Sequence, residues 1–123
     1  MPPVRPSRLK DRLRDPVHGI QRQLQALLHG RALHRVRDRT EAIRPGQVLL
    51  FATLRNEAVR VPAFLDHYRN IGVDHFLFVD NGSDDGTRAF LAEQEDVSLW
   101  TTGASYKRAR FGVDWSNWLA RRY

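Results

Sequence analysis

Three short runs of mostly apolar residues mark the second half of the chain. Residues 48–52 and 75–79 form continuous runs of strand length, and residues 97–100 form a shorter one. Unbroken runs of this kind are typical of strands that are buried on both faces of a parallel sheet. The pattern therefore predicts three buried strands.

Helical spacing appears in the segments between and after these runs. In the first segment, apolar residues recur at steps of three and four, namely Val61, Phe64, Leu65 and Tyr68. Pro62 favours a helix start near its own position, and Ile71-Gly72 ends the pattern. A second helix is predicted over residues 87–94, and a last one around Trp115, whose spacing to Trp118 favours packing into the core.

The order strand, helix, strand, helix, strand predicts an α/β fold with a Rossmann-like βαβαβ unit, half of a doubly wound sheet. Two polar turns, residues 53–57 and 80–87, follow the carboxyl ends of the first two strands. Ligands of such sheets bind beyond these ends. We therefore expect the two turns to lie side by side and to form the candidate site.

The chain before residue 46 has a different character. Residues 1–16 are rich in proline and arginine, which predicts an extended arm. Apolar positions between residues 17 and 39 recur mostly at steps of three and four, which predicts an amphipathic helix. We expect a basic, partly helical N-terminal extension over residues 1–45 and an α/β domain over residues 46–123.

Charge follows the same division. The 123-residue chain has a formal net charge of +6, of which residues 1–45 supply +7 and residues 46–123 supply −1. The extension could therefore bind an anionic membrane surface. We expect no specific nucleic-acid partner, because residues 1–45 include no aromatic side chain that could stack on bases.

Composition also bears on the compartment. The chain has no cysteine, no apolar run long enough to span a bilayer and no apolar stretch of the kind that secretory signals carry. These features favour a cytoplasmic protein, in which the basic extension would allow a peripheral position on the inner face of the membrane.

The turn at residues 80–87 carries the more informative chemistry. Asp80 ends a buried strand and can accept hydrogen bonds from a ribose or a base, while Asn81 can both donate and accept. The same residues also fit a turn without a ligand, because several of them can cap the following helix, namely Ser83, Asp84 and Asp85.

The turn at residues 53–57 offers Thr53, Asn56 and Glu57 beside Arg55. Capping is the alternative here too, with Asn56 starting the helix and Glu57 complementing its dipole. Two polar turns at one edge favour a binding site more than either turn alone.

The two motifs together resemble a known family. Phe51-Ala-Thr-Leu-Arg-Asn-Glu57 and Phe78-Val-Asp-Asn-Gly-Ser-Asp-Asp-Gly-Thr87 look like the opening of family-2-type glycosyltransferases, which have the GT-A fold. The likeness is greatest to the bacterial subgroup with an Asp-Asn-Gly-Ser motif, and it extends through Tyr106 to Trp115. It covers about residues 47–123.

The resemblance implies a nucleotide-sugar site. In the family, the residues at Thr53 and Glu57 approach the base and ribose of the donor, with Asn56 in the same turn. The acidic pair after the second strand, here Asp80-Asn81, holds the base and ribose. A UDP-sugar is the default donor, GDP and dTDP remain open, and the complete enzyme would transfer the sugar to a glycan or lipid acceptor.

The family's metal motif has no counterpart here. Mg²⁺ or Mn²⁺, held by an Asp-x-Asp motif, is expected for the complete enzyme, because a hard cation neutralises the leaving diphosphate. Asp114 is the only acidic residue after Trp100. We therefore expect a truncated chain that binds no metal alone and is catalytically incomplete. The alternative is a noncatalytic binding module whose basic helix engages an anionic membrane, a protein partner or nucleic acid.

Overall fold

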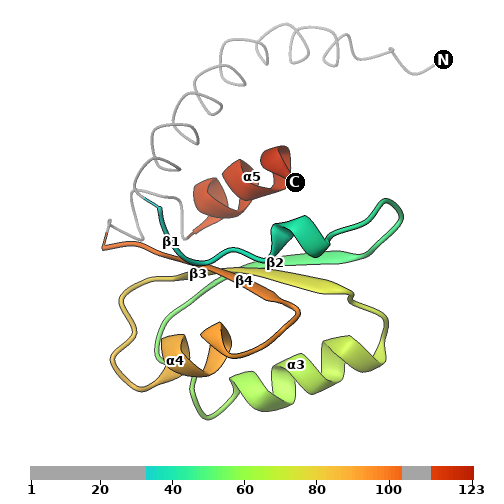
Figure 1. Ribbon diagram of the computed structural model, residues 1–123. Helices are drawn as coiled ribbons and strands as arrows, with labels where there is room; N and C mark the ends of the chain where they lie inside the picture. Colours follow the sequence, from blue (N-terminus) through green and yellow to red (C-terminus); the bar gives the residue numbers. More distant parts are fainter. Residues whose placement is uncertain (1–32, 104–111) are drawn as a thin grey trace, which may run out of the picture.

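The computed structural model describes residues 33–103 and 112–123. In this part of the chain, a four-stranded sheet carries helices on both faces, which makes a mixed α/β fold (Figure 1). The elements in chain order are β1 (His34–Arg37), the 3₁₀ helix η1 (Thr40–Ala42), β2 (Leu49–Leu54), α3 (Val61–Asn70), β3 (His75–Asp80), α4 (Thr87–Ala92), β4 (Val97–Thr101) and α5 (Val113–Arg122).

The sheet has the strand order β1-β4-β3-β2. β2, β3 and β4 are parallel and in continuous register, with Leu49 opposite His75 and Phe76 opposite Val97. All six residues of β3 are buried, as expected for the centre of the sheet. The predicted order of strands and helices from residue 48 onward is therefore confirmed.

Side chains alternate between two hydrophobic cores, one on each face of the sheet. The core under α3 and α4 contains Leu65, Leu91 and the two stacked rings of Phe76 and Phe78. The core on the other face lies under α5, and its buried members are Leu77, Val79, Trp100, Trp115 and Leu119. Trp115 is thus a core residue, as its helical spacing suggested. Figure 1 shows α3 and α4 on one side of the sheet and α5 on the other.

The two flanking helices of the βαβαβ unit begin where the sequence indicates. α3 starts at Val61 with Pro62 in its first turn. Backbone N–H groups in the first turn have no intrahelical acceptor, so the N–H that proline lacks is not missed there. α4 starts at Thr87 and buries Leu91. β2 and β3 run slightly further than expected, so that Thr53, Leu54 and Asp80 belong to strands rather than to the turns.

The helix predicted between residues 17 and 39 is wrong at its C-terminal end. Residues 34–37 form β1, which pairs antiparallel with β4 and places Arg35 opposite Trp100. Arg39 then anchors the connection: its N–H donates to Ser98 Oγ at 2.9 Å, and its guanidinium donates to main-chain oxygens of Val97 and Ala92. These long-range bonds select an extended chain where local periodicity favours a helix.

His75, in the buried strand β3, is only 3% exposed. The predicted arm, the predicted helix up to residue 32, and Tyr106 lie outside the described residues. Within residues 33–103 and 112–123, no helix is both long enough and apolar enough to cross a membrane.

Candidate functional site

The two polar turns are joined by hydrogen bonds. The N–H of Asn56 donates to Ser83 Oγ at 2.9 Å, and the N–H of Asp84 donates back to Asn56 Oδ1 at 2.9 Å. These reciprocal bonds span residues that are 27 and 28 positions apart in sequence. The prediction that both turns lie side by side at the carboxyl ends of β2 and β3 is confirmed.

A second pair of bonds continues the connection toward the two helices. The N–H of Glu57 donates to Thr87 Oγ1 at 3.0 Å, and the N–H of Ala58 donates to Asp85 Oδ2 at 3.1 Å. Asp85 also accepts from the N–H of Thr87, the first residue of α4. The side-chain hydrogen bond from Thr87 is the main reason why the pKa of Asp85 lies below its ordinary value. Asp85 therefore ties the start of α4 to the neighbouring turn.

Asn56 does not start a helix. Its φ is +52°, in the left-handed region that asparagine tolerates better than most residues, and α3 begins five residues later at Val61. The capping alternative for Asn56 is therefore wrong. The residue instead reverses the chain after β2 and bonds to the second turn.

Asp80 lies behind the second turn and is fully buried. Its Oδ2 accepts hydrogen bonds from the N–H of Ser83 at 3.2 Å and from Nε and Nη2 of Arg88 at 3.1 and 3.0 Å. Its Oδ1 is also buried and has no hydrogen-bond partner among the described residues. Because a buried carboxylate requires a partner, the pairing with Arg88 holds Asp80 against the turn.

Thr53 lies at the end of β2 and contacts the start of α5. Its Oγ1 is 3.4 Å from the carbonyl oxygen of Gly112. Gly112 has a φ of +83°, and a Cβ atom there would lie 2.6 Å from Thr53 Oγ1. This close approach brings α5 against the edge of the candidate site.

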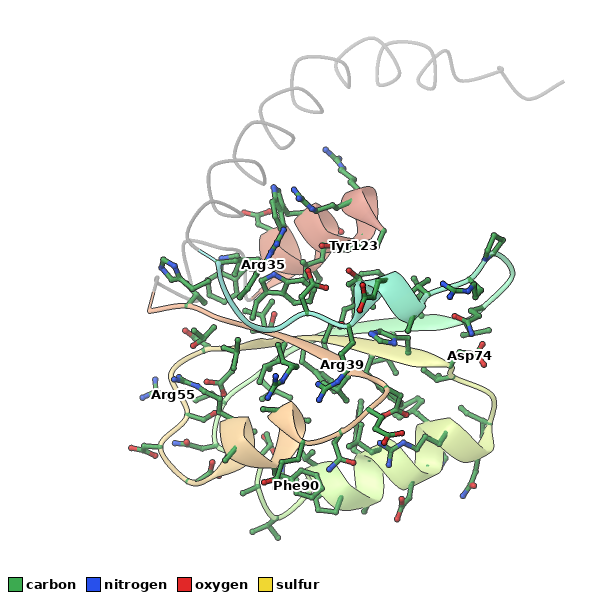
Figure 2. The ribbon with its side chains drawn as sticks, in the orientation of Figure 1. Arg35, Arg39, Arg55, Asp74, Phe90 and Tyr123 are labelled. Carbon is green, nitrogen blue, oxygen red and sulfur yellow. The ribbon has the colours of Figure 1, made fainter. Side chains whose placement is uncertain are left out.

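A pocket of about 530 Å³ opens at the ends of β2 and β3, next to the first turn of α3. Its apolar wall comes from both strands and the helix, and its polar rim comes from the two turns. The lining residues are Ala52, Thr53, Leu54, Arg55, Glu57, Arg60, Val61, Phe64, Phe78 and Asn81. Arg55 extends outward beside the turns (Figure 2).

The five predicted site residues divide into two groups. Thr53, Glu57 and Asn81 line the pocket, whereas Asn56 and Asp80 do not. Those two hold the turns in place through the hydrogen bonds described above. Three of the five predicted residues therefore line a pocket beside the two turns.

Two arginines near these residues, Arg60 and Arg88, had no predicted role. Arg60 lines the pocket and lies 3.7 Å from a carboxylate oxygen of Glu57, while Arg88 pairs with Asp80. The signal for Arg60 was its spacing, since acidic and basic residues three positions apart in a turn can approach each other. Arg88 had a weaker signal, a basic residue in the first turn of the helix that follows a buried acid.

The carboxylates of the site do not form a metal centre. Within residues 33–103 and 112–123, no three side chains of histidine, aspartate or glutamate converge as metal ligands. The hard-cation ligand set expected for a complete transferase thus has no fit among these residues, and we assign no step to a metal.

Comparison of the chain with protein-family models, with curated proteins and with solved structures gives no match.

Proposed function

We propose that residues 46–123 are the Rossmann-like, nucleotide-sugar-binding half of a GT-A-type glycosyltransferase domain. The observation that carries the proposal is the pair of interlocked turns at the carboxyl ends of β2 and β3, which border a pocket of about 530 Å³. Ligands of parallel α/β sheets bind at this edge. The size of the pocket lies within the range of small-molecule sites.

The composition of the pocket supports a nucleoside ligand. Phe64, which is half-buried, supplies aromatic surface on which a base can lie. The carboxamide of Asn81 offers both a donor and an acceptor to the base edge, and Glu57 offers acceptors to ribose hydroxyls. The fixed backbone of both turns means that these groups are positioned before a ligand arrives.

Cationic groups at the rim support an anionic ligand. Arg55 and Arg60 both line the pocket and both are exposed to solvent. A guanidinium can bind two phosphate oxygens at once, which suits the diphosphate of a nucleotide sugar. The expected donor is a UDP-sugar, and the titration compares UDP with GDP and dTDP.

The test is an NMR titration of the isotope-labelled full chain with UDP, UDP-glucose, GDP and dTDP. We expect saturable shift changes at Thr53, Glu57 and Asn81, and at least tenfold weaker binding by Asn81→Ala. Asn70→Ala is the matched control, because Asn70 is an exposed asparagine at the end of α3. No saturable shifts at these residues with any of the nucleotides would refute the site.

A second candidate function has a specific observation in its favour. Arg35, Arg121 and Arg122 are exposed and lie on the α5 side of the sheet, where Figure 2 shows Arg35 and Tyr123. The pKa of Asp38 is lowered although burial alone would raise it, because hydrogen bonds from Thr40 and the charges of Arg35 and Arg122 outweigh that burial. These arginines therefore form a local basic surface that could bind anionic lipid.

Vesicle co-sedimentation separates this candidate from the first. Binding that requires anionic lipid, falls with salt and is weakened by Arg121→Gln plus Arg122→Gln would support a membrane-binding module. Binding to nucleotide without binding to vesicles would support the donor site alone.

A further inference from the structure

The two edges of the sheet are built differently. β1, at one edge, has only four residues, all exposed, and its register is interrupted between Arg35 and Arg37. Three of its four side chains are basic or histidine. Short length, irregular register and cationic side chains are means by which natural proteins keep a sheet edge from pairing with another strand.

β2, at the opposite edge, has none of these features. Its six residues carry no charge, and they pair with β3 in unbroken register. All six are half-buried, whereas every residue of β3 is buried. Val48, directly before the strand, is 53% exposed. A regular, uncharged and apolar edge of this length is a surface suited to the addition of another strand.

The hydrogen bonds of β2 show which of its backbone groups face outward. The carbonyl oxygen of Val48 accepts from residues 74 and 75, and that of Leu54 accepts from the N–H of Asn81. Since neighbouring residues of a strand point their N–H and C=O groups to opposite sides, the groups of Leu49, Phe51 and Thr53 face away from β3. Among residues 33–103 and 112–123, no strand pairs with this edge of β2.

We propose that β2 pairs with β2 of a second copy of this chain. The two strands run antiparallel about a two-fold axis at Phe51, and they join two four-stranded sheets into one of eight strands. In this arrangement Phe51 lies opposite Phe51, and Leu49 lies opposite the partner's Thr53. Each residue with outward N–H and C=O groups then meets another such residue, as an antiparallel ladder requires.

The side chains of β2 are self-complementary in this register. On the α3 side of the sheet Leu50 lies opposite Ala52 and Val48 opposite Leu54, so apolar residues meet apolar residues there. On the α5 side Phe51 meets Phe51, and Leu49 meets the β-branched Thr53. Gln47 lies opposite Arg55, and no residue from 47 to 55 meets a like charge. A two-fold interface uses the same patch on both copies, so this self-complementarity is what favours a second copy over an unrelated strand.

The pairing also extends the candidate site. Leu54 and Arg55 line the pocket, and in the dimer they face Val48 and Gln47 of the partner subunit. Each pocket is then bordered by the other copy. The dimer itself is independent of the proposed ligand, because it rests on β2 and not on the polar turns.

Sedimentation velocity over a range of concentrations tests the dimer. We expect a reversible species of twice the 14.3 kDa chain mass. Val48→Lys adds a charge at the end of the edge and should weaken the dimer at least tenfold. Val59→Lys is the matched control, since Val59 is 94% exposed and lies outside β2. A monomer at all concentrations, open-ended aggregates, or equal dimerisation of both variants would overturn the proposal.

Hydrogen exchange of the unaltered chain gives a second test that requires no variant. In the dimer, the N–H groups of Leu49 and Phe51 should exchange slowly, and dilution to the monomer should make them exchange fast. Those of Leu50 and Ala52, which face β3, should stay protected at both concentrations. Fast exchange of Leu49 and Phe51 in the dimeric sample would show that the copies associate through another surface.

Discussion

Thr53 and Gly112 approach each other so closely that position 112 has no room for a side chain. A Cβ atom on Gly112 would lie 2.6 Å from Oγ1 and 2.7 Å from Cβ of Thr53. The contact joins residues 59 positions apart and brings the start of α5 to the end of β2. It constrains how the last helix sits beside the candidate site.

Gly112→Ala should therefore be strongly destabilising. Gly46→Ala is the matched control, because Gly46 has nearly the same φ, +84° against +83°, but no atom within 4 Å of its would-be Cβ. The control should lose about 1 kcal/mol from the backbone conformation alone. Gly112→Ala should lose about 2 kcal/mol more, because overpacking forces α5 away from β2. Urea unfolding followed by circular dichroism measures both, and equal losses would contradict the close contact.

The sequence predicted three of the four described strands and missed β1. β2, β3 and β4 follow from their apolar runs because a strand between two layers of helices must be apolar on both faces. β1 has no such run. Its extended conformation depends on pairing with β4 and on the bonds of Arg39 to residues 92, 97 and 98, none of which leaves a local pattern.

The candidate site shows the same limit. The spacing of the motifs was enough to place two polar turns together, because parallel strands bring their carboxyl ends to one edge. It could not show that Asn56 and Asp80 hold the turns in place while Glu57 and Asn81 line the pocket. That division depends on the left-handed backbone of Asn56 and on the position of Arg88, which follow only from the packed structure.

Arg88→Leu tests the support of the buried carboxylate. Asp80 is fully buried, and Arg88 supplies two of the three hydrogen bonds to its Oδ2. Removing Arg88 leaves the charge unpaired, and because the arginine side chain is 42% exposed we expect a loss of about 2 kcal/mol, below the range for fully buried pairs. Adding Asp80→Asn should restore part of the loss, since the amide carries no charge. A double variant no more stable than Arg88→Leu would argue against the charge as the cause.

Variants of Asn56 separate its side-chain hydrogen bond from its left-handed backbone conformation. Asn56→Gly keeps the left-handed backbone accessible but removes the acceptor for the N–H of Asp84, so it should lose about 1 kcal/mol. Asn56→Ala removes the acceptor and also disfavours the backbone, so it should lose about 1 kcal/mol more. Both free energies come from chemical unfolding at neutral pH. If the two variants are equally stable, the positive φ of this residue carries no energetic cost.

His75 should make the fold sensitive to mild acid. Its side chain is 3% exposed and its Nε2 lies 2.8 Å from Ser98 Oγ. Burial lowers the pKa of His75 below the ordinary value of 6.5, although the nearby charge of Asp96 acts in the opposite direction. The unfolded chain therefore takes up a proton first. The contribution of the neutral, buried His75 to stability is complete above about pH 6.5 and is lost as the pH falls below that value.

The expected slope is at most about 1.4 kcal/mol per pH unit, because one proton is involved. The free energy of unfolding, measured from pH 7.5 down to about pH 5, should fall for the unaltered chain and stay nearly flat for His75→Gln. His67→Gln, at an exposed position on α3, should behave like the unaltered chain. The paired carboxylate of Asp96, whose pKa is lowered mainly by its hydrogen bond from Arg69, acts only at lower pH. A fall of the same size in His75→Gln would assign the acid sensitivity to another group.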